Sequence, residues 1–213
     1  MIAKLRCLIV CLCSLIIIIG CSTPVMKLNH PLKLDASYSQ IGTIKVILFK
    51  DERLEEEKNE DMTAMNTLSP RLISGATYPI IIQYFHNTLR EEIEKTKIFS
   101  ITNTAQYVLS GEINSMKVER RVNVFRYFTF GLLDFPELTA TVKYRAVLRK
   151  EGKIIFEKYI EQLERETYWA WSNFTFISWK KISNRGSCIL DKCISNSIKK
   201  LFNEIESQIK TKI

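Results

Sequence analysis

The sequence contains none of the short motifs that commonly mark an active site. Among its 213 residues there is no nucleophile elbow, phosphate-binding loop, HExxH zinc motif, Cys-x-x-Cys pair or Rossmann glycine fingerprint. Carboxylates and serines are plentiful, but they indicate no reaction without a recognisable arrangement. We therefore predict no catalytic, cofactor-binding or metal-binding residues and no cofactor, and we expect a protein that is not an enzyme.

Metal ligands are also scarce. The only two histidines are His30 and His86, and neither is near Cys188 or Cys193 in sequence, so we predict no zinc site. The acidic run at 55–61 lacks the alternating Asp/Asn spacing and the glycine of a calcium-binding loop. We expect this run to lie solvated within a long loop over residues 50–78.

The chain also lacks an apolar run long enough for a permanent membrane span. The apolar segment at 7–19 falls short of the roughly 20 residues that a spanning helix needs. It follows the positive charges of Lys4 and Arg6, which is the order found in signal peptides. We predict that residues 1–20 form a signal peptide.

The end of this segment carries a more specific signal. A series of isoleucines is followed by Gly20-Cys21, and this order resembles the lipobox of bacterial lipoproteins. The resemblance implies a lipid (diacylglycerol) on the Cys21 thiol, cleavage before this residue, and a further acyl chain, such as palmitate, on the new amino group. Ser22 favours the outer membrane. An uncleaved anchor or an ordinary signal peptide is the alternative.

The physical consequence of lipidation at Cys21 is stable attachment to a membrane. One acyl chain holds a protein only marginally, whereas two or more make attachment effectively permanent. We therefore expect a cell-envelope protein, anchored by its N-terminal lipid and facing the periplasm from the outer membrane. Removing Lys4 and Arg6 from the 31 basic residues leaves 29 against 23 acidic residues. Without a nucleic-acid-binding module, we assign this excess to a solvated surface and anionic lipid, and predict no nucleic-acid partner.

Export also simplifies the cysteines. Three of the six leave with the signal peptide and Cys21 is lipidated, so only Cys188 and Cys193 remain, in a compartment that permits disulfides. In a regular helix, positions five apart point about 140° away from each other. A disulfide between this pair therefore requires one cysteine to lie outside the helix, and otherwise both are small buried residues. Both alternatives stay open.

Hydrophobic periodicity outlines the rest of the chain. Residues 21–41 are polar and irregular and are predicted to form a lipid-anchored tether, and residues 42–213 a single α+β periplasmic domain. We predict strands at 43–49, largely buried on both faces, at 99–102 and at 106–118, and a hairpin over 139–166 with its turn at 151–153. In the first strand of the hairpin the inward residues are Ala140, Val142, Tyr144, Ala146 and Leu148. We also predict a helix at 79–97 with a core stripe of Ile82, Phe85, Leu89 and Ile93, and a helix at 187–209 that Ser187 can cap. The expected fold has two layers, with an antiparallel or mixed sheet of four to five strands and two main helices packed on one face.

Two aromatic stretches are ambiguous. Residues 125–138 form either a lid over the sheet or an exposed patch for a partner or membrane surface. Residues 168–179 contain six aromatics, and Trp169, Trp171, Phe174 and Phe176 alternate as in a strand. For this second stretch we favour core or interface packing over a platform for a ligand.

One set of segments carries a family resemblance. The set consists of a strand ending in FKDER (49–53), a helix containing LREEI (89–93), Phe99, and AQYVLSGEI (105–113), in which Gly111 indicates a bulge or a close backbone approach. This order resembles small periplasmic lipoproteins, including the auxiliary lipoproteins of ABC-type transport systems, YajG-like lipoproteins, and the amino-terminal fold of TolB and of the curli secretion lipoprotein. The resemblance covers residues 43–118 and, more loosely, 138–210.

The resemblance implies a non-enzymatic accessory protein. We expect a partner-binding component of an envelope transport or assembly complex. A subunit of a secretion or surface-assembly machine is the alternative within this class, and an envelope hydrolase is the alternative outside it.

Overall fold

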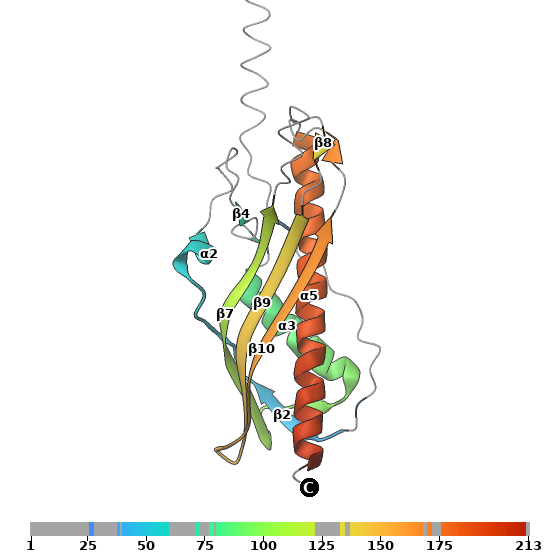
Figure 1. Ribbon diagram of the computed structural model, residues 1–213. Helices are drawn as coiled ribbons and strands as arrows, with labels where there is room; N and C mark the ends of the chain where they lie inside the picture. Colours follow the sequence, from blue (N-terminus) through green and yellow to red (C-terminus); the bar gives the residue numbers. More distant parts are fainter. Residues whose placement is uncertain are drawn as a thin grey trace, which may run out of the picture.

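The computed structural model describes residues 26–27, 38, 40–59, 71–72, 77–78, 80–121, 133–134, 137–167, 170–171 and 176–211 (Figure 1). The predicted signal peptide and Cys21 lie outside the described residues. Within them the fold is α+β, with one mixed sheet and two main helices. The predicted fold class is therefore confirmed at this level.

The central sheet is larger than predicted. Its continuous path has the order β10-β9-β7-β2-β6, and the two-residue strands β3 and β4 also pair with β7, which makes seven strand segments instead of four to five. β2 runs parallel to β6 and β7, whereas β7, β9 and β10 are antiparallel. The bounds are β2 Gly42–Val46, β3 Lys50–Asp51, β4 Arg71–Leu72, β6 Phe99–Ile101, β7 Tyr107–Arg121, β9 Glu137–Lys150 and β10 Lys153–Thr167.

The additional strands escaped prediction because two residues are too few to show a period. The predicted strand at 43–49 stops at Val46 and the chain pairs with β7 again at Lys50, so Ile47 and Leu48 lie between two strands. These two side chains are 44% and 55% exposed, which contradicts the prediction of a strand buried on both faces.

The hairpin of β9 and β10 confirms the strongest strand prediction. Glu151 and Gly152 turn the chain with positive φ angles of 50° and 81°. Every second side chain of β9 is fully buried, as the alternating pattern predicts, because only one face of the sheet packs on the helices. These buried residues are Ala140, Val142, Tyr144, Ala146 and Leu148.

Two helices pack on that buried face (Figure 1). Helix α3 spans Ile81–Thr96, close to its predicted bounds, and the expected stripe of Ile82, Phe85, Leu89 and Ile93 is buried. Helix α5 spans Phe176–Thr211, so the predicted start at 187 is wrong. Ser187 does not cap the helix, because its hydroxyl donates to the Asn184 carbonyl one turn earlier. Phe176 begins this helix and is not a strand residue.

Three aromatic rings join the layers. The centroids of Phe49, Phe85 and Tyr144 lie 5.0 to 5.9 Å apart, and the Tyr144 hydroxyl donates a 3.0 Å hydrogen bond to the Ser197 carbonyl of α5. Gly111 makes this packing possible, since an added Cβ would lie 2.3 Å from Phe49 Cε1. The predicted close approach at Gly111 is thus confirmed, and the register irregularity lies between Ile113 and Ser115.

The described part of the predicted tether contacts the domain at two places. Strand β1 (Met26–Lys27) pairs with β5 (Thr77–Tyr78), just before α3, and also lies against α5. Tyr38 packs edge-on against Phe202, with ring centroids 5.9 Å apart, and donates a 2.9 Å hydrogen bond to Asn203 Oδ1. Among the helices in the described ranges, none is both long enough and apolar enough to cross a bilayer.

Candidate functional site

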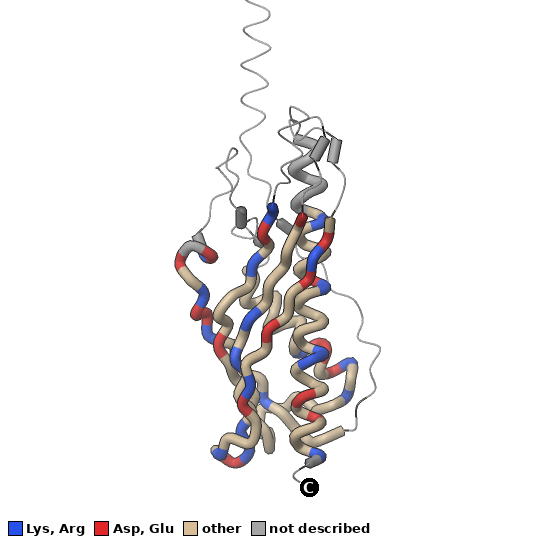
Figure 2. Tube along the Cα trace, in the orientation of Figure 1, with Lys and Arg blue, Asp and Glu red and all other residues tan. Residues whose placement is uncertain are grey.

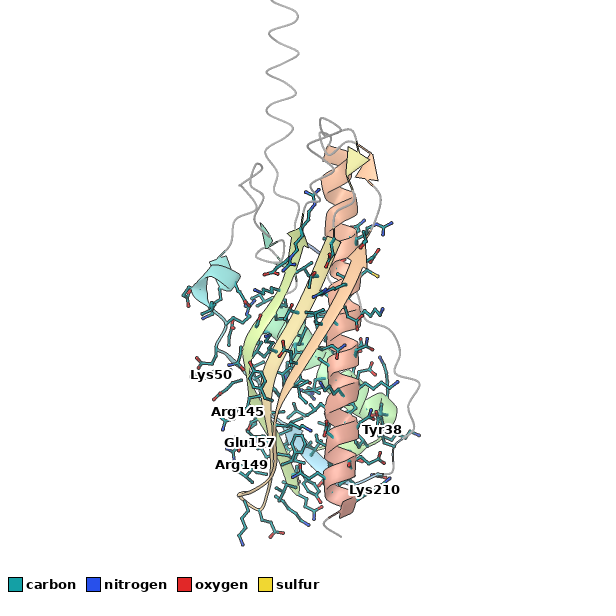
Figure 3. All side chains as sticks on the ribbon, viewed as in Figure 1. Tyr38, Lys50, Arg145, Arg149, Glu157 and Lys210 are labelled. Carbon is teal, nitrogen blue, oxygen red and sulfur yellow. The ribbon has the colours of Figure 1, made fainter. Side chains whose placement is uncertain are left out.

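The face of the sheet opposite α3 and α5 carries exposed charged side chains. Strand register places Glu112, Arg145 and Tyr159 side by side across β7, β9 and β10, on the face opposite the buried side chain of Tyr144. We call this surface the open face. Figure 3 shows the side chains of Lys50, Arg145, Glu157 and Arg149 gathered on the side away from α5.

Ion pairs cross the strands of the open face. Arg145 donates to Glu157 at 2.6 Å and lies 3.6 Å from Glu112, while Lys143 lies 2.7 Å from Glu161. Figure 2 shows the same mixture of signs along β7, β9 and β10. The hydrogen bond that Arg145 donates to Glu157, followed by the negative charge of Glu157, raises the pKa of Arg145 above its ordinary value. Because these pairs are roughly half exposed, solvent screens their attraction, so they arrange charge more than they stabilise the fold.

A hollow of about 170 Å³ lies on the open face near the β9–β10 turn. Three basic residues and one acidic residue line this hollow. Arg149 Nη1 donates a 2.9 Å hydrogen bond to Ser110 Oγ. Among the described residues, no carboxylate lies within ion-pair distance of Arg149. The full lining is Lys50, Ser110, Gly111, Glu112, Arg145, Val147, Arg149 and Ile154.

Apolar side chains border these charges. Ile154, Tyr159 and Leu163 of β10 are 54%, 52% and 42% exposed, and their pairing with β9 places them on the open face. Exposed aromatic and aliphatic side chains beside arginines are a common composition at protein interfaces. The open face therefore combines exposed apolar side chains with charged ones.

The outer edge of β10 is less suited to binding. Side chains of α5 donate to its backbone: Lys200 Nζ to the Glu161 carbonyl at 3.1 Å, and Gln208 Nε2 to the Ile155 carbonyl at 3.4 Å. A sheet edge whose carbonyls accept such bonds presents fewer groups to an added strand.

Helix α2 (Glu55–Asn59) borders the open face along β7. The Glu57 carboxylate accepts hydrogen bonds from Ser115 Oγ at 2.9 Å and from the Met116 amide at 3.2 Å, where the register of β7 shifts. Part of the acidic run at 55–61 therefore forms a short helix rather than a solvated loop.

The two cysteines for which a disulfide was left open, Cys188 and Cys193, both lie within α5 and are unbonded. The condition for a disulfide, that one cysteine lie outside the helix, is not met in this structure. Cys188 is exposed, whereas Cys193 is buried and its thiol lies 3.4 Å from the Gln162 carbonyl. Burial, followed by the charge of Glu164, raises the pKa of Cys193 to about 12. Cys193 is thus a packing residue.

His86 is the described histidine considered at the sequence level. His86 is half-buried on α3, where burial, followed by the charge of Arg90, lowers its pKa. Within the described ranges, no group of three or more His, Cys, Asp and Glu residues could hold a metal ion. His30 and Cys21 lie outside those ranges.

The two aromatic stretches meet in the fold. Strand β8 (Leu133–Asp134) pairs antiparallel with β11 (Ala170–Trp171), so segments 125–138 and 168–179 are joined by a short sheet. Figure 1 shows β8 beside the first turns of α5. Trp169, Phe174 and most of 125–138 lie outside the described residues, so the alternatives of lid and exposed patch remain predictions.

The comparisons with known proteins concern the fold. No protein-family model matches the sequence, and no curated protein shows detectable sequence similarity to it. Protein XCC0632 of Xanthomonas campestris, described under family DUF330, has a similar structure: the TM-score is 0.51 at 9% identity, over 89% of this chain and 99% of that chain. The similarity shows a shared fold.

Two solved structures resemble the chain more weakly. The hypothetical protein CT253 of Chlamydia trachomatis has a TM-score of 0.42 at 9% identity, over 80% of this chain and 99% of that chain. A minor lipoprotein of Acinetobacter baumannii has a TM-score of 0.39 at 11% identity, over 78% of this chain and 90% of that chain.

The hollow on the open face was not predicted from the sequence. A partial signal was present, because Lys143, Arg145 and Arg149 occupy the outward positions of the alternating segment 139–150. Their partners Glu112 and Glu157 belong to two other strands, and only the strand register brings them together.

Proposed function

We propose that this protein is a non-enzymatic, lipid-anchored protein of the bacterial cell envelope that binds a protein partner through its open face. Acylated Cys21 holds the domain to the membrane, facing the periplasm from the outer membrane. The partner belongs to an envelope transport or assembly complex, of which this protein is an accessory component.

The hollow near Arg149 is the observation that supports partner binding most directly. It joins three cationic side chains, those of Lys50, Arg145 and Arg149, to the exposed apolar surface of Ile154. Charged groups orient an approaching protein, and apolar surface contributes affinity when it is buried. Lys50 and Arg145 already pair with Glu52 and Glu157, whereas the hydrogen bond of Arg149 goes to the neutral Ser110 hydroxyl. Arg149 is therefore the cation in the hollow that fits an acidic side chain of the partner.

The proposed lipid anchor supports partner binding because it keeps the domain near other proteins of the same membrane. A domain held to a membrane explores a thin layer, which raises its effective concentration toward other components there. A modest interface on the open face then suffices for stable association.

Site-specific photo-crosslinking in native membranes tests the partner-binding surface. A photoreactive residue at Tyr159 reports on the open face, and one at Lys199, which is exposed on α5, is the matched control. We expect crosslinked membrane-complex components from position 159 and not from position 199. Two further probes on the open face, at positions 157 and 163, extend the test. If all three probes leave the protein as an uncrosslinked monomer, or if the two faces give equal products, the assignment is overturned.

The same preparation separates the alternative functions. A ring-shaped homo-oligomer crosslinked through the open face would indicate a secretion or surface-assembly subunit. Release of products from envelope lipid or peptidoglycan by the purified protein would indicate a hydrolase.

A pair of cysteine substitutions tests the anchor. Cys21→Ala is expected to abolish incorporation of labelled palmitate and to release the protein from membranes. Cys188→Ala, which changes an exposed cysteine of α5, is the control and should retain both properties. A Cys21→Ala protein that is still cleaved, acylated and membrane-bound would contradict the lipid assignment.

A further inference from the structure

The chain between the proposed lipid and the folded domain is short. Cys21 precedes β1, which begins at Met26 and is paired with β5 and packed on α5. Five residues span at most about 18 Å when fully extended, because each contributes at most about 3.6 Å. Wherever β1 lies on the domain, the membrane surface must therefore be close.

Two contacts place β1 along the length of the domain. Its partner β5 ends at Tyr78, three residues before α3 begins at Ile81. The first turns of α3 lie at Asp191 of α5, because the Tyr84 hydroxyl donates a 2.7 Å hydrogen bond to Asp191 Oδ1. Strand β1 therefore lies against α5 close to Asp191.

Helix α5 gives the position of Asp191 relative to the sheet. It runs antiparallel to β10, since Arg185 pairs with Glu166 and Gln208 donates to the Ile155 carbonyl. At about 1.5 Å per residue, Asp191 lies about 9 Å from the level of Glu166 and about 26 Å from that of Ile155. The anchored chain can therefore reach the Glu166 end of the sheet, and it cannot reach the β9–β10 turn.

The end within reach carries the paired aromatic segments. The first nine residues of α5 precede Arg185 and extend about 13 Å past Glu166. Figure 1 shows this part of the helix rising beyond the ends of β9 and β10, with β8 beside it.

Cationic residues of the sheet at this end suit a lipid surface. Arg121 and Arg165 are exposed there, and cationic side chains near a membrane are attracted to anionic head groups. Composition and chain length therefore point to the same surface.

We propose that the domain stands on the membrane that holds its lipid, with the end formed by β8, β11 and the first turns of α5 against the lipid surface. This orientation rests on the proposed anchor at Cys21. The β9–β10 turn then points away from the membrane, and the open face is turned sideways. Glu157 lies beside the hollow and is ten residues from Thr167 along β10. At about 3.3 Å per residue, the hollow is therefore about 33 Å from the end of the domain that faces the membrane.

Energy transfer to lipid tests the orientation. The full-length lipidated protein with Cys188→Ser is placed in vesicles that contain a rhodamine-labelled lipid, and a fluorophore is attached at Thr167→Cys or Lys153→Cys. These exposed positions lie at opposite ends of β10, about 46 Å apart, so we expect at least about twofold higher transfer from position 167. Equal transfer, or higher transfer from position 153, would overturn the proposal.

A linker insertion tests the role of the short chain. Twenty glycine and serine residues inserted between Thr23 and Pro24 should bring the two transfer values together, because the domain could then turn. An unchanged difference would overturn the role of the short chain in orienting the domain.

A separate measurement distinguishes failure of the anchor from failure of the orientation. If the lipidated protein does not float with vesicles, the anchor at Cys21 is wrong. The orientation is then measured on chain 22–213 carrying a hexahistidine tag in place of the lipid, bound to vesicles with a nickel-chelating lipid. In this tagged protein, energy transfer from position 167 must again exceed energy transfer from position 153.

Discussion

Tyr84 of α3 donates a 2.7 Å hydrogen bond to Asp191 Oδ1 of α5, and both side chains are buried. The two residues are 107 positions apart in the chain. A buried acceptor that loses its donor retains most of its desolvation cost, so this single bond links the stability of the two helices. The same contact sets the position of β1 along α5.

Removing the donor should destabilise the fold. We expect Tyr84→Phe to lower the free energy of unfolding by about 1–3 kcal/mol, because Asp191 keeps its burial and loses this hydrogen bond. Urea denaturation measures the change. Tyr159→Phe is the control, since Tyr159 is 52% exposed, and should change stability by less than about 0.5 kcal/mol. Equal effects of the two variants would contradict the role of the Tyr84 bond.

Alkaline pH should weaken the fold. Burial raises the pKa of Tyr84 and of Tyr144, with Asp191 adding to the effect at Tyr84, so both hydroxyls stay protonated in the folded state. In the unfolded chain they ionise near about pH 10, which means that stability is fully present below this pH and is lost as the pH rises above it.

Ionisation of the Cys193 thiol should also lower the stability of the fold at alkaline pH. Its pKa is raised to about 12 in the folded protein, so its contribution begins to fall above about pH 9, the ordinary range of a thiol. We expect a lower urea midpoint at about pH 11 than at about pH 8. Tyr84→Phe should show a smaller loss between these pH values, and an unchanged midpoint in the unaltered protein would contradict the prediction.

The two cysteines should differ in reactivity. Cys188 is exposed and should react with a maleimide in the native protein, whereas Cys193 should react only after unfolding, because it is buried and protonated. Peptide mapping by mass spectrometry identifies the modified residue. An intact mass lower by two hydrogens would instead indicate a disulfide between them.

Gly111→Ala should be strongly destabilising. The added Cβ would lie 2.3 Å from Phe49 Cε1 and 2.2 Å from the Arg145 carbonyl oxygen, so a core ring and a neighbouring strand would both have to shift. We expect a loss of at least about 1–3 kcal/mol, the usual cost of overpacking, by thermal or urea unfolding. Gly152→Ala is the comparison, since no atom lies within 4 Å there and only its positive φ opposes the change, at about 1–2 kcal/mol.

Charge removal on the open face should separate binding from stability. Arg145→Ala and Arg149→Ala should each leave the urea midpoint of unfolding nearly unchanged, because the bonds that these side chains make lie at the surface and are screened by solvent. Both should reduce partner crosslinking from position 159. Lys199→Ala on α5 is the control and should leave crosslinking unchanged.

Local patterns predicted the regular elements well. The alternation over 139–150 identified the buried residues of β9, and the spacing of Ile82, Phe85, Leu89 and Ile93 identified α3, because each pattern reports burial against one surface. The start of α5 was missed: alternating aromatics before Phe176 suggested a strand, and Ser187 suggested a cap. Both features are local, whereas the helix continues upstream of Ser187.

By itself the sequence determined the β9–β10 hairpin, helix α3, the buried side of β9 and the close approach at Gly111, because these depend on residues near one another in the chain. It also supplied the lipobox-like Gly20-Cys21, from which the anchor is proposed. The tertiary structure decided which charges share the open face, since Glu112, Arg145 and Glu157 meet only through the register of three strands. It likewise decided where β1 lies, because that depends on pairing between segments about 50 residues apart.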